Sequence, residues 1–312
     1  MSFIPCAFLV LLALAHRTTC LQGTWQPLAS IAIAPRQEHT TLFVPPDSIL
    51  LLGGITGDNA TTTTNLVQQY SIRKNRWESF PPLPLALNHL NAAFMNDKIY
   101  VQRTWRSIAP VPEPRGSAAM GVYDGKVILA GGLKQIQLVS PYVQQTVDSV
   151  SIYNAAQNRW VTVPTASSTM PDPRDHACAA VINEHFYVLG GRERGQLKGK
   201  GTVLMLDLKD LRAGWTIGPV NMLTPRAGLS CGATGSKIYT FGGEGNLRVD
   251  SAVFNEMEVY DVATKTWEEL GEMRVSRHGT GAVSVRGKIY VPGGGDVIGI
   301  APVSYFDALV PS

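Results

Sequence analysis

The sequence contains little charge, little cysteine and only one long apolar run. Charged residues make up 16% of its 312 residues, and the formal net charge is +3. So small a charge excludes a bulk nucleic-acid surface, and this composition is not that of a disordered chain or a coiled coil. The four cysteines form no CxxC or other metal-type spacing. The length allows one large all-β domain or two ordinary ones.

The only long apolar run, from Ile4 to Ala15, lies at the N-terminus. It is too short to span a bilayer as a helix but has the length of a signal-peptide core, and Ala13-Leu14-Ala15 offers a small-x-small cleavage pattern. We therefore expect a signal peptide over residues 1–20, with cleavage near 15–23, and one domain over residues 21–312. The mature protein is then expected to be secreted, extracellular and free of the membrane.

Two further features depend on this route. Asn59-Ala60-Thr61 is a glycosylation sequon, although such a tripeptide also arises by chance. Cys6 leaves with the signal. We expect Cys178 and Cys231 to be small buried apolar side chains, with a disulfide between them as the alternative that an oxidising compartment permits.

Glycine pairs recur along the chain, mostly about fifty residues apart. Each ends an apolar stretch that follows a tight-turn signal such as Asp124-Gly125, so each unit contains a hairpin. An aromatic residue or Leu before a polar residue comes next, and most units then carry a Trp. Four short strands per unit are typical of a β-propeller blade. The pairs are Gly53-Gly54, Gly131-Gly132, Gly190-Gly191, Gly242-Gly243 and Gly293-Gly294, and the tryptophans are Trp77, Trp160, Trp215 and Trp267.

Gly-Gly, Tyr and Trp in this order resemble the kelch repeat over nearly the whole mature chain. The resemblance implies an all-β, kelch-type β-propeller with six repeat units. The last unit stops at Phe306-Asp307-Ala308 without a Trp strand, while an unpaired strand with Trp25 stands near the start. We expect the Trp25 strand to complete the sixth unit and close the ring, as it commonly does in kelch propellers.

The second unit is truncated. Its strand Lys98-Ile99-Tyr100-Val101 leads into Gln102-Arg103-Thr104-Trp105, where a Gly pair should occupy positions 103 and 104. Trp105 follows the strand after only three residues. The second and fourth strands of a blade run parallel, and three residues cannot carry the chain back across the sheet to start a parallel strand. Either this blade is rebuilt with fewer strands, or, as we favour, the sequence reflects a skipped exon or a faulty gene model. We expect a defective blade whose Trp105 strand is mispaired or poorly ordered.

Long, varied loops follow the Gly pairs, so we expect the binding site at that face, near the axis. Counting fourteen residues back from each pair, or from its expected position, gives three histidines among six equivalent positions, with arginines close by. One interpretation is structural, in which each Arg bonds backbone carbonyls. The other is a basic funnel for an anionic or polyhydroxylated ligand. The candidate residues are Arg36, His39, His89, Arg115, Arg174, His176, Arg226, Arg277 and His278.

A metal held by His39, His89 and His176 is geometrically conceivable, but no acid stands at a matching position, and we predict no metal or cofactor. The chain resembles the kelch core of galactose oxidase, but it has no Tyr-His pair and no loop cysteine for the copper site. It also resembles bacterial N-acetylneuraminate epimerase, a secreted six-bladed ring. Mutarotation of that kind needs an acid, a base and an Arg, which Glu193, Glu244 or His176 with Arg174 could supply.

Binding is therefore expected more than catalysis. No segment resembles the BTB or BACK domains of intracellular kelch adaptors, and no catalytic triad, phosphate loop or zinc signature occurs. We predict a secreted, monomeric propeller that binds a carbohydrate or protein ligand, and no nucleic acid, at the mouth carrying the Arg and His residues. The alternative is a sugar-directed enzyme of mutarotase, epimerase or galactose-oxidase type.

Overall fold

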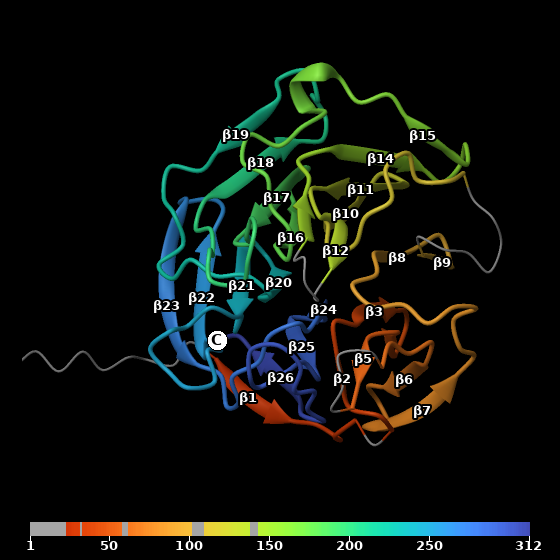
Figure 1. The fold of residues 1–312 in the computed structure, drawn as a ribbon, viewed down its shortest axis with the longest axis vertical. Coiled ribbons are helices and arrows are strands. Elements are labelled where there is room, and N and C mark those ends of the chain that lie inside the picture. The colour runs from red at the N-terminus through yellow and green to blue at the C-terminus, as the bar shows by residue number, and fades with distance from the viewer. Residues whose placement is uncertain (1–22, 32, 58–61, 102–108, 138–142) are drawn as a thin grey trace, which may run out of the picture.

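The computed structural model describes residues 23–312 except 32, 58–61, 102–108 and 138–142. These residues form antiparallel sheets arranged radially around one centre, five of them four-stranded (Figure 1). The first comprises β3 (Thr40–Val44), β4 (Ser48–Leu52), β6 (Val67–Ser71) and β7 (Arg76–Phe80). The third comprises β10 (Ala119–Tyr123), β11 (Lys126–Ala130), β14 (Val150–Asn154) and β15 (Arg159–Val161). The fourth comprises β16 (Cys178–Ile182), β17 (His185–Leu189), β18 (Val203–Asp207) and β19 (Trp215–Ile217).

The remaining sheets complete the ring. The fifth comprises β20 (Ser230–Thr234), β21 (Lys237–Phe241), β22 (Glu256–Asp261) and β23 (Thr266–Glu272). The sixth comprises β24 (Val283–Val285), β25 (Lys288–Pro292), β26 (Phe306–Val310) and β1 (Thr24–Pro27). Within the described residues, the second holds β8 (Ala92–Met95) and β9 (Lys98–Val101) alone. Two short pairs, β2 (Arg36–Gln37) with β5 (Ile55–Thr56) and β12 (Leu133–Gln137) with β13 (Val143–Thr146), and the 3₁₀ helix η1 (Thr165–Ser167) lie in connections.

The two ends of the chain close the ring as predicted. Trp25 of β1 lies opposite Leu309 of β26 in an antiparallel pair, so the N-terminal strand forms the outer edge of the last blade (Figure 1). Each innermost strand contacts the next, in the cycle β3, β8, β10, β16, β20, β24 and back to β3. The Trp25 closure is therefore confirmed.

The Gly pairs join neighbouring blades. The N–H of Gly243 donates to the carbonyl of Arg277 at 2.9 Å. Gly242, at φ +56°, lies so close that a Cβ there would be 2.0 Å from the same oxygen. The other four pairs dock the carbonyl at the corresponding position of the next unit in the same way. Only glycine allows this approach, which explains why the pair recurs in the sequence.

The core lies between adjacent blades. Trp77 packs against Phe306 of the sixth blade with ring centroids 5.2 Å apart, and its indole N–H donates to the Ala29 carbonyl at 2.8 Å. Tyr70, almost fully buried, completes this aromatic cluster. The repeated Trp therefore fills the space between sheets, and the indole N–H groups of Trp77, Trp160 and Trp215 each donate to a backbone carbonyl.

The second unit shows only its hairpin. Met95 lies opposite Lys98 across a two-residue turn, and no further strand among the described residues pairs with β9. The predicted Trp105 strand lies in 102–108, outside the described residues. The segment expected to be a signal peptide and the Asn59 sequon also lie outside them. No helix in the described part of the chain is long and apolar enough to cross a bilayer.

The two remaining cysteines of the domain correct an expectation. Cys178 of β16 and Cys231 of β20 form a disulfide, with Cα atoms 5.8 Å apart. They were expected to be buried thiols, with the disulfide only the alternative. Sequence spacing could not decide between the two, because the bridge depends on how two innermost strands from different blades face one another.

Candidate functional site

A closed ring of backbone hydrogen bonds surrounds the propeller axis. One residue from each unit donates its N–H to the carbonyl of the equivalent residue in the preceding unit, and the N···O distances run from 2.6 to 3.2 Å. All six residues have φ between +48° and +62°. The ring residues are Glu38, His89, Ser117, His176, Gly228 and Gly279.

The first unit contributes Glu38 and not His39, so one predicted position is wrong. Val44 lies opposite Ser48 across a three-residue turn, whereas Tyr123 lies opposite Lys126 across two. The extra turn residue makes a fixed offset of fourteen miss by one. An acid therefore stands at the position where none was expected.

His39 packs between the first and sixth blades. A Cβ at Gly54 would lie 2.9 Å from the His39 Cβ, and one at Gly293 would lie 3.2 Å from its ring. Neither ring nitrogen of His39 makes a hydrogen bond of normal geometry. The nearby backbone carbonyls of Arg36 and Pro292 act to raise the pKa of His39. Burial, followed by the charge of Arg36, lowers the pKa of His39 to about 3.

The predicted arginines lie inside the blades. Arg226 pairs with Glu258 at 2.8 Å, and Arg174 donates to the carbonyls of Gly190 and Thr202 at 2.9 Å each. All five are at most 3% exposed, and none lines the axial cavity. These five arginines therefore form no basic funnel at the mouth, and their contacts match the structural interpretation. The five are Arg36, Arg115, Arg174, Arg226 and Arg277.

A cavity of about 200 Å³ lies on the axis. Its walls come from the ring residues and from the next few residues of each innermost strand, so it extends from the ring toward the short hairpin turns. We had expected the site among the long loops, on the other side of the ring. The lining residues are Glu38, His39, Thr40, Thr41, His89, Leu90, Asn91, Ser117, Ala118, Met120, His176, Ala177, Gly228, Leu229, Gly279, Thr280 and Gly281.

A buried polar network fills the long-loop side of the ring. In the five units that have a Gly pair, the residue before the ring position pairs with the residue after the Gly pair, which brings Asp175 to Arg192 and His278 to Gly295. Arg192 donates to Asp175 at 3.3 Å and also bonds Glu244. His278 lies 3.7 Å from Glu244, so this predicted residue belongs to the network and not to the cavity wall.

Two acids on the loops after Gly pairs had been considered as catalytic groups. Glu244 reaches the axial network and is 2% exposed. Glu193 lies on the loop surface, where it pairs with Lys200 at 3.2 Å. Arg192 was not among the predicted site residues, although its position directly after a Gly pair is the signal that could have identified it.

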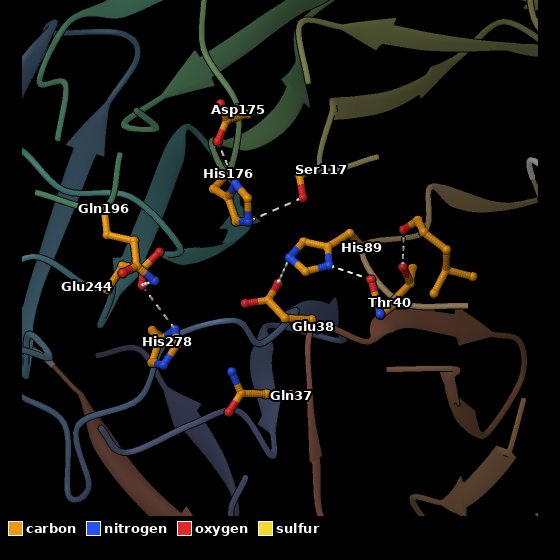
Figure 2. Close-up of polar contacts among 12 residues, drawn as sticks. Gln37, Glu38, Thr40, His89, Ser117, Asp175, His176, Gln196, Glu244 and His278 are labelled. Carbon is orange, nitrogen blue, oxygen red and sulfur yellow. Dashed lines mark hydrogen bonds and ion pairs between the residues drawn. The ribbon is translucent and has the colours of Figure 1, made fainter. Parts of the chain in front are cut away.

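Glu38, His89 and His176 converge from three units where the ring borders the cavity (Figure 2). His89 Nε2 lies 3.3 Å from Glu38 Oε2. The two imidazoles stack edge to face with centroids 5.1 Å apart, and the Ser117 hydroxyl lies 3.4 Å from His176 Nε2. The histidine predictions at 89 and 176 thus reach the axis together.

The charges of this group follow from its surroundings. Burial acts to raise the pKa of Glu38, but the positive potential of His89, His176, His278 and Arg192 outweighs it and lowers the pKa to about 2. Burial, with a smaller contribution from Arg192, lowers the pKa of His176 to about 4. At neutral pH the cavity therefore presents an ionised carboxylate beside a neutral imidazole.

Comparison with known proteins defines the class. The KLHDC2/KLHL20/DRC7 Kelch-repeats domain matches residues 101–295, well over half of the chain. Together with the propeller and its Gly pairs, this match shows that the chain belongs to the kelch-repeat family. Propellers of this family are typically protein-binding modules.

Individual relatives agree. Kelch-like protein terF of Aspergillus terreus is 37% identical over 92% of this chain and 68% of its own length. Beta-scruin of Limulus polyphemus is 23% identical over 81% of this chain, and human Kelch-like protein 23 is 26% identical over 52%. The chain spans about two thirds of the first of these proteins but only 29% and 30% of the other two.

Proposed function

We propose that this chain is a secreted kelch propeller that binds a carbohydrate in the axial cavity. The observation that carries the proposal is the mixed lining of that cavity. Carboxylate, imidazole and hydroxyl groups of Glu38, His89, His176 and Thr41 share it with the apolar side chains of Leu90, Leu229 and Met120. A sugar presents hydroxyls at its rim and C–H groups on its faces, so such a lining suits it.

The charge of the cavity lining indicates which class of sugar it can bind. Among the described residues, the cavity lining includes Glu38 but no Arg or Lys, and the five predicted arginines point into their blades. An anionic sugar would face the Glu38 carboxylate with none of these cations beside it, so we favour a neutral polyhydroxylated ligand over the anionic one considered from the sequence. The buried Thr41 hydroxyl has no partner in the described residues, and a rotation of this lining side chain would turn the hydroxyl toward a ligand.

The volume of the cavity limits the size of the ligand. A cavity of about 200 Å³ is smaller than the ~300–1,000 Å³ of sites for drug-sized molecules. One sugar ring fits this space, either as a free monosaccharide or as the terminal residue of a glycan. A protein partner on the rim is the competing class of ligand.

Secretion is the second part of the proposal. The Cys178–Cys231 disulfide supports it, because disulfides persist in oxidising compartments and are rare in the cytosol. Expression with the native N-terminus should place a monomeric, disulfide-bonded protein in the medium. Retention in the cytosol with two free thiols would contradict this.

Saturation-transfer NMR with purified protein tests the ligand. Neutral monosaccharides, sugar acids and a peptide panel are compared. We expect saturable binding of a neutral sugar, weakened roughly tenfold or more by Thr41→Val or Ser117→Ala, as loss of a buried hydrogen bond predicts. Ser79→Ala, on the exposed outer strand β7, is the control and should bind normally. Binding of a peptide with no sugar response would refute the carbohydrate assignment.

The pairing of Glu38 with His89 favours one catalytic alternative, a sugar mutarotase. An ionised carboxylate 3.3 Å from an imidazole provides the two proton-transfer groups that anomer exchange requires. Exchange NMR of neutral hexoses tests it. Rates equal to those in buffer alone would exclude this activity.

A further inference from the structure

We propose that Glu38, His89 and His176 bind a divalent first-row transition-metal ion where the ring borders the axial cavity. This site goes beyond the proposed function and does not depend on it. One ligand atom from each residue lies within 4.8 Å of the others, and His89 Nε2 is 3.3 Å from Glu38 Oε2 (Figure 2). Metal bonds of ~2.0–2.2 Å place tetrahedral ligand atoms roughly 3.2–3.6 Å apart, so small side-chain rotations complete the site.

Hydrogen bonds hold both imidazoles in the required orientation. His89 Nδ1 bonds the Asn88 side-chain oxygen at 2.7 Å, and His176 Nδ1 bonds Asp175 Oδ1 at 2.6 Å. An N–H at Nδ1 leaves the lone pair on Nε2, which is the nitrogen that faces the axis. Metal-binding histidines almost always donate their other N–H in this way, often to a carboxylate.

The surrounding charge favours a cation. Glu38, Asp175 and Glu244 contribute three carboxylates to the axial cluster, and Arg192 contributes one guanidinium. Three carboxylates and one guanidinium leave a net charge of −2, which a divalent ion compensates. Buried charges otherwise carry a large desolvation cost.

The backbone makes the site rigid and leaves one side open. All three residues belong to the hydrogen-bonded ring, and each comes from a different unit. Gly228 and Gly279 complete the ring, and a Cβ at position 279 would lie 2.4 Å from Glu38 Oε1, so the carboxylate lies over this glycine. All three proposed ligands also line the axial cavity, which leaves a position open on that side. Three protein ligands with an open position toward a cavity are the arrangement of metal sites that exchange a water or a substrate.

The donor set selects the kind of metal. Two imidazoles and one carboxylate suit Zn²⁺ or Fe²⁺, whereas Ca²⁺ and Mg²⁺ prefer oxygen ligands. Arg192 Nη2 lies 3.3 Å from His176 Nε2 and would lose this contact when an ion binds. Asp175 and Glu244 keep its guanidinium paired.

The experiment uses the purified full chain, stripped with EDTA and titrated with Zn²⁺ or Co²⁺ alone. We expect one ion per chain by elemental analysis, visible Co²⁺ absorption bands typical of a low-coordinate N/O site, and no competition by millimolar Mg²⁺. Glu38→Gln and His89→Ala should each weaken binding about 100-fold or more, exceeding the 10–100-fold loss expected for the outer partner in Asp175→Asn. His185→Ala, a histidine on strand β17 far from the ring, should bind normally.

Circular dichroism establishes that each variant is folded, and the Co²⁺ spectrum of the unsubstituted protein requires no variant. Failure of that protein to bind either ion in a one-to-one ratio overturns the proposal. Binding that survives both Glu38→Gln and His89→Ala also overturns it. Sugar titrations on metal-free and metal-loaded protein distinguish the carbohydrate proposal from the metal proposal. A protein that binds one metal ion but shows no response to sugar would refute carbohydrate binding and support the metal site.

Discussion

The side-chain amide of Asn91 donates a hydrogen bond to the backbone carbonyl of Arg115 at 2.8 Å. At the other junctions the equivalent carbonyl accepts from the second glycine of a pair, as Gly132 does with Arg174 at 2.9 Å. Asn91 also accepts from the N–H of Ala118 at 3.2 Å. In the truncated unit, which has no Gly pair, a side chain therefore joins the second blade to the third.

Replacement of Asn91 tests this junction. Asn91→Ala leaves the buried Arg115 carbonyl without its donor, which should lower the free energy of unfolding by about 1–3 kcal/mol. Urea denaturation measures the change. Asn221→Ala, at an exposed position, is the control and should stay within about 0.5 kcal/mol of the parent. Equal effects of the two substitutions would show that Asn91 has no such role.

The Gly pairs allow a comparison at matched backbone geometry. Gly242 and Gly235 have φ of +56° and +58°, but only Gly242 has a neighbouring carbonyl where a Cβ would stand. Gly235→Ala should cost roughly 1–2 kcal/mol from backbone strain alone. Gly242→Ala should cost about 3 kcal/mol or more, because the Arg277 carbonyl must move. Similar losses in thermal or urea unfolding would refute the docking explanation for the pair.

Much of the fold could be predicted because its signals are local. Each Gly pair marks a point where two backbones meet, and each hairpin carries its own turn residues. The Trp25 strand could be assigned to the last unit because that unit lacks a Trp of its own. The Cys178–Cys231 disulfide could not be predicted, since its geometry depends on two strands from different blades. The same limit applies to Asn91, whose partner lies in the next unit.

The site was predicted only in part. His89 and His176 follow from the repeat, but one additional turn residue after Val44 moved the ring position from His39 to Glu38. The arginine pattern gave the positions and left two side-chain directions open, because a periodic residue says nothing about where its side chain points. The guanidinium of Arg226 forms an ion pair with Glu258 inside its own blade, and its side chain therefore points away from the axis.

The disulfide should stabilise the innermost strands. It closes a loop with a sequence separation of 53 residues, for which loss of unfolded-state entropy predicts about 4 kcal/mol, with about 2–4 kcal/mol typical in practice. Thermal unfolding with and without dithiothreitol measures this. The Cys178→Ala/Cys231→Ala protein should melt at a lower temperature and ignore the reductant. A parent protein that ignores the reductant as well would show that the bridge contributes nothing.

Asp172 makes part of the stability dependent on pH. Burial acts to raise its pKa, but hydrogen bonds from Lys200 and Thr202 and the charge of Arg174 outweigh burial and lower it. A carboxyl group whose pKa is lower in the folded state stabilises the protein above its ordinary value of about 4, and this contribution is lost as the pH falls through the folded pKa.

Asp172→Asn should therefore destabilise the protein at neutral pH, and the difference from the parent should shrink as the pH falls below about 4. Urea midpoints measured across this range provide the test. Asp250→Asn, at an exposed position, is the control and should follow the parent curve throughout. A difference between Asp172→Asn and the parent that stays constant down to the lowest pH would mean that the carboxylate charge is not what Arg174 and Lys200 require. In that case the loss of stability would come from the changed size and hydrogen bonding of the side chain and not from its charge.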